Sequence, residues 1–234
     1  MSCSAVIVAA GSSRRMGFDK VLVPLLGVPL IRHSVAAFNA CDAIEDIVIV
    51  VAAERLGAVR EAVSGLEKVA AFPLGGETRA ESVARGLAAV SGRFVAVHDA
   101  ARPLVTTELI GRCVSRARGT RAATAAERLT DTLQRGEGGE GVEVVPRDDL
   151  WRIQTPQVFE TAFIREALAS AEEDGAVMTD ETSAALRAGV RSSLVENLDW
   201  NFKVTIPRDV PLAEAVLRER AAEMADGIAQ LSGA

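Results

Sequence analysis

The chain has 234 residues, of which 49% are apolar and 25% are charged, and its net charge at pH 7 is −6. This composition is typical of a globular protein. A net negative chain argues against a general nucleic-acid-binding surface, which needs a basic stripe. No apolar stretch reaches the roughly 20 residues that span a bilayer. We therefore expect neither a nucleic-acid nor a membrane partner, and any phosphate site must gather its cations locally.

Three cysteines, Cys3, Cys41 and Cys113, lie far apart in the sequence. An odd number of cysteines without a C-x-x-C pair does not suit a disulfide framework. The first ten residues hold a short apolar run with no basic region before it, which is typical of a first strand rather than a signal peptide. The sequence therefore predicts reduced thiols and a cytoplasmic location.

Short apolar runs alternate with helical patterns in the first half of the chain. The apolar runs suit strands that are buried on both faces: Ala5–Ala10, Ile47–Ala52 and Phe94–Val97. The helical patterns lie between and after them: Ile31–Asn39, Leu56–Ser64, Glu81–Ala89 and Glu108–Ala117. This rhythm predicts an α/β fold with an open, mostly parallel sheet and helices on both faces. Ligands of such sheets bind at the carboxyl ends of the strands.

The pattern changes after about residue 128. Thr130–Arg135 and Val142–Val145 flank the glycine-rich segment 136–141, which predicts a polar hairpin that protrudes from the body. Further elements follow: helices at Thr161–Glu172 and Thr182–Ala188, a strand at Phe202–Ile206, and a helix from Pro207. We expect a single domain over residues 1–234, with a β-arm inserted at about 130–150.

The first strand is followed by a basic, glycine-containing loop, Ala9–Lys20. Gly11 and the serines after it would let backbone N–H groups approach phosphate oxygens. Arg14, Arg15 and Lys20 would supply positive charge for a polyanion. By composition alone, a surface loop with solvated cations fits equally well.

The segment Gly75–Ser82 places two glycines before a helix, so it forms another loop that a ligand can approach closely. The alternative is an ordinary turn in which Glu77 and Ser82 cap the helix. Asp99 ends a buried strand, where it could hold Mg²⁺ between phosphates, and Arg102 could face the same anion. The two histidines, His33 and His98, are best interpreted as structural.

The sequence offers many cations at strand ends and no evident general base. With two histidines and no H-E-x-x-H motif, a hydrolase triad and a zinc site are both disfavoured. A phosphate monoester nucleophile is already anionic near neutral pH and needs no base. Its transfer chemistry depends on positioning and on cations that offset the charge of two polyanions.

Together, these segments resemble the methylerythritol phosphate cytidylyltransferases of the non-mevalonate isoprenoid pathway, from about Ala5 to Leu217. The matching pieces, in chain order, are the Ala9–Lys20 loop, Gly75–Ser82, His98-Asp99-Ala100-Ala101-Arg102-Pro103, Asp131-Thr132, Arg147 ahead of Leu150-Trp151, Thr155-Pro156-Gln157, Thr179-Asp180-Glu181, and Asn201-Phe202-Lys203-Val204-Thr205. The string from His98 to Pro103 is the most specific of them.

The resemblance implies a Rossmann-like nucleotidyltransferase sheet and a reaction of CTP with 2-C-methyl-D-erythritol 4-phosphate that releases pyrophosphate. It implies that Arg15, Lys20, Lys203 and Arg147 are catalytic. It assigns CTP binding to Ala9, Ala10, Gly11, Ser12, Arg15, Lys20, Gly76, Glu77, Ser82 and Asp99, with Asp99 also holding the cofactor Mg²⁺. It assigns the polyol phosphate to Arg102, Thr132, Arg147, Thr179 and Lys203. The family is a homodimer, so Thr132 and Arg147 on the arm would complete the partner's site.

The sequence departs from the family pattern in two places. Asp19-Lys20-Val21 stands where the family usually has Pro-Lys-Gln, and Arg128-Leu129-Thr130 stands where Pro-Val commonly precedes the Asp-Thr pair. A ribitol-5-phosphate cytidylyltransferase is the nearest alternative, followed by a nucleotidyltransferase for another base or sugar phosphate. A non-catalytic nucleotide-binding protein would be expected to lack Arg15, Lys20 or Lys203. A hydride-transferring enzyme is disfavoured because no G-x-G-x-x-G follows the first strand.

Overall fold

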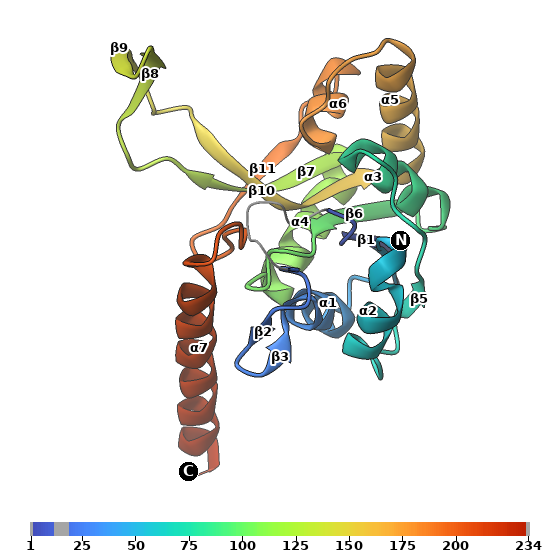
Figure 1. Ribbon diagram of the computed structural model, residues 1–234, viewed down its shortest axis with the longest axis vertical. Helices are drawn as coiled ribbons and strands as arrows, with labels where there is room; N and C mark the ends of the chain where they lie inside the picture. The colour runs from blue at the N-terminus through green and yellow to red at the C-terminus, as the bar shows by residue number, and fades with distance from the viewer. Residues whose placement is uncertain (1, 12–18, 233–234) are drawn as a thin grey trace.

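Seven strands form the central sheet of the protein. The computed structural model describes residues 2–11 and 19–232, and for residues 227–232 it describes the backbone alone. The order of the strands is β11-β7-β10-β6-β1-β4-β5 (Figure 1). Their bounds are β1 Cys3–Val8, β4 Asp46–Val50, β5 Val69–Ala71, β6 Phe94–Asp99, β7 Ala122–Arg128, β10 Trp151–Glu160 and β11 Ser193–Glu196. Strand β10 is antiparallel to both of its neighbours, and all other pairs are parallel. The predicted mostly parallel α/β sheet is confirmed.

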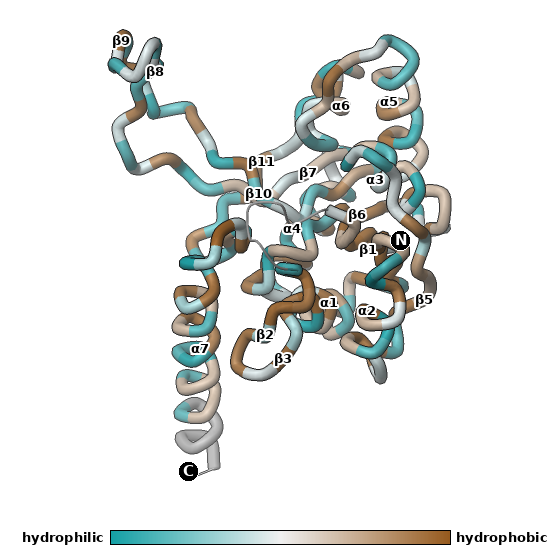
Figure 2. The backbone as a smooth tube through the Cα atoms, in the orientation of Figure 1, coloured by the Kyte–Doolittle hydropathy of each residue, from teal (hydrophilic) through white to brown (hydrophobic). Residues whose placement is uncertain are grey.

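Helices cover both faces of this sheet. On one face, α1 (Leu30–Ala40), α2 (Leu56–Ala62) and α4 (Thr107–Thr120) share one apolar core with alternate residues of β1 and β4. On the other face, α3 (Arg79–Ala88), α5 (Thr161–Glu173) and α6 (Glu181–Arg187) share a second core with the intervening strand residues. Because β1 and β6 lie between the two layers, they are buried on both sides, which explains why most of their residues are apolar (Figure 2).

A third, smaller core lies at the start of the last helix. The short hairpin β2 (Pro24–Leu25) and β3 (Val28–Pro29) packs there against Val204 and the first turns of α7 (Asp209–Ser232). The predicted strand at Phe202–Ile206 is wrong: the segment belongs to no sheet, and the Val204 N–H donates to the carbonyl of Ala101 (2.8 Å).

The last helix also begins later than the sequence predicts. It starts at Asp209 and not at Pro207. The Asp209 carboxylate accepts hydrogen bonds from the N–H groups of Thr205 (2.7 Å) and Ile206 (3.0 Å), so it holds the turn that precedes the helix. No helix in the described ranges is long and apolar enough to cross a membrane.

The predicted hairpin arm is confirmed and projects from the body (Figure 1). Its strands are β8 (Leu133–Glu137) and β9 (Glu140–Val145). The glycine-rich connection is shorter than expected, because the ladder continues to the pair Glu137 and Glu140. Only Gly138 and Gly139 form the turn, with φ of 59° and 92°, a geometry that a tight two-residue hairpin turn requires.

The three cysteines are free and buried. Burial raises the pKa of Cys3 and of Cys113 to about 12. These thiols therefore contribute to the packing of the core and not to catalysis.

Candidate active site

A cavity of about 380 Å³ lies at the carboxyl ends of β1 and β6. The loops after β1, β5 and β6 converge there, as the topology of a parallel sheet dictates. Most of the residues predicted for CTP line it: Ala9, Ala10, Gly11, Lys20, Gly76, Glu77, Ser82 and Asp99, together with Lys203. The other two predicted CTP residues, Ser12 and Arg15, lie outside the described residues.

The two glycines before α3 allow the second loop to pack tightly against the first. A Cβ on Gly75 would overlap the Cβ of Ala10, and a Cβ on Gly76 would overlap the side chain of Glu81. The glycines therefore serve close packing within the protein, and the close approach of a ligand to this loop stays a prediction.

Helix α3 is not capped by Glu77 and Ser82, which was the alternative interpretation of this loop. Thr78 is the N-cap, and its hydroxyl accepts from the N–H of Glu81 (3.1 Å). Ser82 does not cap its own helix; its Oγ accepts from the N–H of Gly76 (3.1 Å) and donates to the Thr78 carbonyl (2.9 Å). Glu77 provides an N–H to the Glu81 carboxylate (2.9 Å). Polar groups of this loop thus fix the cavity wall.

Asp99 stands at the centre of a cluster of cations. Lys203 Nζ lies 2.8 Å from Asp99 Oδ2, and Arg79 Nη2 lies 3.3 Å from Oδ1. Arg102 Nε is 3.9 Å from Oδ2. Burial disfavours the charged form of Asp99, but Arg79, Lys203 and Arg102 outweigh that effect and hold its pKa well below the ordinary value. Asp99 is therefore an ionised carboxylate near neutral pH.

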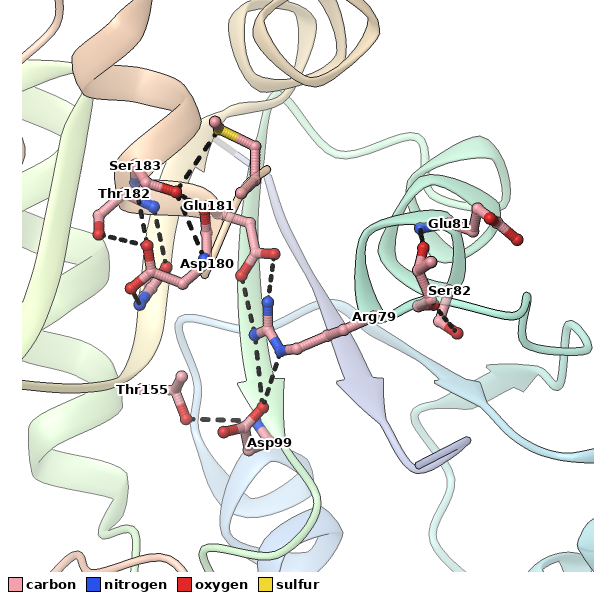
Figure 3. A network of polar contacts seen from close by, with 12 residues as sticks. Arg79, Glu81, Ser82, Asp99, Thr155, Asp180, Glu181, Thr182 and Ser183 are labelled. Carbon is pink, nitrogen blue, oxygen red and sulfur yellow. Dashed lines mark hydrogen bonds and ion pairs between the residues drawn. The ribbon is translucent and has the colours of Figure 1, made fainter. Parts of the chain in front are cut away.

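Arg79 links this cluster to Glu181, the first residue of α6 (Figure 3). Its guanidinium forms a two-pronged ion pair with Glu181, at 2.6 Å and 3.0 Å, while also reaching Asp99. The Glu181 side chain is 1% exposed. Burial raises its pKa, although Arg79 opposes that shift. The sequence alone predicts no role for Arg79 or Glu181, because their ion pair joins residues far apart in the chain.

Lysine usage provides a signal that sequence analysis could have used. The chain has 26 basic residues but only three lysines, Lys20, Lys68 and Lys203. Two of the three line the cavity. A compact ammonium acts as a point charge, whereas guanidinium forks fill the ion pairs elsewhere in the molecule.

The residues predicted to bind the acceptor lie farther apart than those predicted to bind CTP, and most of them do not line the cavity. Arg102 is largely buried and donates to the Asn201 carbonyl (2.7 Å). Thr179 is exposed, and it lies two positions before Glu181. Thr132 and Arg147 are exposed at the base of the arm, and Arg147 donates to the carbonyl of Thr130. Of the acceptor residues, only Lys203 lines the cavity.

His98 is structural, as expected. Its ring nitrogens contact the Thr155 hydroxyl (2.9 Å) and the Arg102 carbonyl (3.3 Å), and its ring packs against Phe38. The Thr155 hydroxyl also accepts from the Asp99 N–H (3.2 Å). The histidine therefore supports the backbone around Asp99 and does not line the cavity.

His98 should make the protein less stable in acid. Burial lowers its pKa to about 3, whereas an unfolded histidine binds a proton below about 6.5. Between these values the unfolded state binds more protons, so stability falls as the pH falls, by up to about 1.4 kcal/mol per pH unit. Urea unfolding of wild type and His98→Gln at pH 7 and pH 5 checks this: the stability advantage of wild type should shrink at pH 5. An unchanged difference would contradict the burial effect.

The residues around Asp99 could hold Mg²⁺ only if substrate phosphates and water supply most of its ligands. No group of three or more His, Cys, Asp or Glu side chains that could hold a metal is found among residues 2–11 and 19–232. Asp99 and Glu77 are the carboxylate residues among those that line the cavity. Mg²⁺ commonly binds one or two carboxylates and completes its shell with water and substrate phosphates. The carboxylate of Asp99, in a cavity that Lys20 and Lys203 also line, matches that pattern.

A second hollow, of about 610 Å³, lies between α3 and α5. Arg79 borders both spaces, but Lys20, Asp99 and Lys203 line only the smaller one. The charges suited to a triphosphate thus belong to the cavity at the strand ends.

A mostly parallel α/β sheet with this cation-lined cavity at its carboxyl edge defines an α/β nucleotidyltransferase. Residues 3–219 match the family model described as "IspD: 2-C-methyl-D-erythritol 4-phosphate cytidylyltransferase". The chain belongs to this family.

Named relatives agree with that assignment. The 2-C-methyl-D-erythritol 4-phosphate cytidylyltransferase of Halalkalibacterium halodurans is 39% identical over 228 residues, which cover 94% of this chain and 99% of that protein. The protein of the same name from Synechococcus sp. is 40% identical over 92% of this chain and 97% of its own length. The crystal structure of the Thermus thermophilus protein of that name superposes with a TM-score of 0.80 at 35% identity, covering 93% of this chain and 100% of that one.

Proposed function

We propose that this enzyme transfers the cytidylyl group of CTP to the phosphate of 2-C-methyl-D-erythritol 4-phosphate, giving 4-diphosphocytidyl-2-C-methyl-D-erythritol and pyrophosphate for isoprenoid precursor synthesis. The observation that carries the proposal is the cavity that Lys20 lines and in which Lys203 and Arg79 form ion pairs with Asp99, in a chain of this family.

The nucleotide occupies the wall that the first two loops build. Ala9, Ala10 and Gly11 would contact CTP from the β1 side, and Gly76, Glu77 and Ser82 from the α3 side. Ser12 and Arg15 are also proposed to bind CTP. Lys20 would face the triphosphate and stabilise the charge that builds on the leaving pyrophosphate. The small residues fit this role because backbone N–H groups can then approach the ligand.

The acceptor phosphate is the nucleophile. One of its oxygens attacks the α-phosphorus of CTP, and the bond from that phosphorus to the β-phosphate bridge breaks. Lys203 would hold the acceptor phosphate beside Asp99, with Arg102 and Thr179 around it. No proton has to be removed, which agrees with His98 being buried, neutral and directed elsewhere.

Mg²⁺ is the proposed cofactor, with Asp99 as its protein ligand. When bound with the nucleotide, it would neutralise part of the phosphate charge. Because Lys203 and Arg79 already contact the two Asp99 oxygens, they hold the carboxylate ionised and oriented toward the cavity.

A homodimer is proposed because the arm exposes its predicted acceptor residues away from its own cavity. Val142 and Val144 on the arm are 54% and 60% exposed, and Trp200 beyond β11 is 52% exposed. Apolar residues on a projecting hairpin suit contact with a second copy. Thr132 and Arg147 would then complete the site of the partner. A cytoplasmic location is also proposed, supported by three free buried thiols.

Subunit mixing tests the shared site. Lys20→Ala and Arg147→Ala homodimers should each be nearly inactive. After equal mixing and subunit exchange, half of the dimers carry one intact site, so activity should recover to about a quarter of wild type. If mixed dimers form, as shown by differently tagged subunits, and activity does not recover, then Arg147 does not act in trans.

Product identification tests the reaction itself. The purified protein with CTP, Mg²⁺ and 2-C-methyl-D-erythritol 4-phosphate should give a nucleotide whose ³¹P spectrum shows two coupled phosphorus atoms of a diphosphate bridge, with an equal amount of pyrophosphate. Release of CMP or CDP instead of a bridged product would refute the proposed transfer.

A further inference from the structure

Arg55 connects both ends of the first loop. It ends the short 3-10 turn η1 (Ala53–Arg55) just after β4, and its side chain is 10% exposed. Because β4 is the parallel neighbour of β1, Arg55 reaches the residues that follow β1. Its Nη1 donates to the carbonyls of Ala9 (3.2 Å) and Gly11 (2.8 Å), and its Nε lies 2.8 Å from Asp19 Oδ2.

Asp19 links Arg55 to the backbone next to Lys20. Its Oδ2 pairs with Arg55, and its Oδ1 accepts from the N–H of Val21 (3.2 Å). Val21 is 2% exposed, so it anchors this contact in the core. The Asp19 carboxylate therefore fixes the backbone on both sides of Lys20, whose side chain lines the cavity.

The pair also balances charge next to the cavity. The Asp19 side chain is 30% exposed and is next in the chain to Lys20, which in the proposed function faces the CTP phosphates. An unpaired carboxylate there would repel CTP, and the Arg55 guanidinium offsets it at close range. Neither Asp19 nor Arg55 lines the cavity, so any effect of the pair on catalysis must pass through the loop and Lys20.

We propose that Arg55 and Asp19 form a positioning pair, which holds the ends of the first loop, orients Lys20 toward the CTP phosphates and cancels the Asp19 charge. This inference rests on CTP being the nucleotide substrate. It assigns a function to residue 19, where this chain departs from the Pro-Lys-Gln pattern.

Steady-state kinetics of four proteins test the pair: wild type, Arg55→Met, Asp19→Asn and the double variant. Arg55→Met should lose roughly 10²-fold in kcat/KM for CTP, because it misplaces Lys20 and leaves Asp19 unpaired. The KM for the polyol phosphate should change little. The double variant should regain part of the loss, since the Asp19→Asn change removes the charge that repels phosphate but keeps an amide oxygen that can accept from the Val21 N–H. Arg60→Met, on the adjacent helix α2, is the matched control and should behave like wild type.

Thermal unfolding establishes that each variant is folded before its kinetics are interpreted. If Arg55→Met does not fold, Arg55→Lys replaces it, because lysine keeps the charge but cannot bridge Ala9, Gly11 and Asp19 at once. Normal kcat/KM for CTP in the folded Arg55 variant would overturn the inference. A loss that Asp19→Asn does not relieve would also overturn it, because Arg55 would then act only as a structural residue. Wild type that does not use CTP would refute the proposed function, and this inference with it.

Discussion

Replacing Lys20 by methionine should reduce kcat for pyrophosphate release by roughly 10²–10³-fold, the usual cost of removing one preorganised charge contact to a transition state. Lys20 lines the cavity with Asp99 and Lys203. Its ammonium would stabilise charge that is larger on the transition state than on bound CTP, so kcat should fall more than the affinity for CTP.

The small number of lysines gives this experiment a matched control. Lys68 donates to the carbonyl of Cys41 (2.8 Å) and does not line the cavity. Lys68→Met should therefore retain normal turnover, and Lys20→Arg should retain part of it, since it keeps the charge but not the ammonium geometry. Lys20→Met with turnover close to that of Lys68→Met would rule out a transition-state role for Lys20.

Replacing Arg79 by methionine should destabilise the protein by about 3–5 kcal/mol, because it leaves the buried Glu181 carboxylate without its counter-charge. Loss of Arg79 also removes the largest influence that lowers the pKa of Asp99. The variant should consequently lose stability and turnover together. Equilibrium unfolding in urea measures the first effect, and pyrophosphate release the second.

The pH dependence of this variant has a definite sign. Burial already raises the pKa of Glu181, and without Arg79 that pKa must rise further. The folded state then holds a proton that the unfolded state has lost, so the variant should gain stability relative to wild type as the pH falls from 8 toward 5. The double variant Arg79→Met, Glu181→Met removes both charges and should recover much of the loss. If the two single losses simply added in the double variant, the ion pair would not be the source of the effect.

Local sequence patterns were sufficient to predict the strands that are buried on both faces, because such strands are runs of consecutive apolar residues. The runs in β1, β4 and β6 are apolar throughout because both faces are covered, and each was predicted within a few residues of its bounds. Strand β7, in contrast, is rich in alanine, which favours helices, and its strand form depends on the neighbours β10 and β11. Segment 202–206 alternates apolar and polar residues as a strand would, but it belongs to no sheet among the described residues.

The site residues likewise divide into those that local sequence predicts and those that only the packed structure reveals. Asp99 could be identified because it ends a strand of the predicted parallel sheet, and Lys20 because it lies in the loop that follows another such strand. The glycines before α3 could be identified because they precede a predicted helix, whereas strand β5 before them was not predicted. The pairing of Arg79 with Glu181, and of Arg55 with Asp19, could not be predicted, because each pair is formed only when distant segments pack. Only the structure shows that the cations around Asp99 come from α3, from the loop after β6 and from the extended segment before α7.

The most direct test of the central claim is pyrophosphate release by wild-type protein from CTP and Mg²⁺, with 2-C-methyl-D-erythritol 4-phosphate and ribitol 5-phosphate compared as acceptors. We predict release that depends on the acceptor and a clearly higher kcat/KM for the methylerythritol phosphate. A higher kcat/KM for ribitol 5-phosphate, or no release with either acceptor from folded protein, would contradict the proposed function.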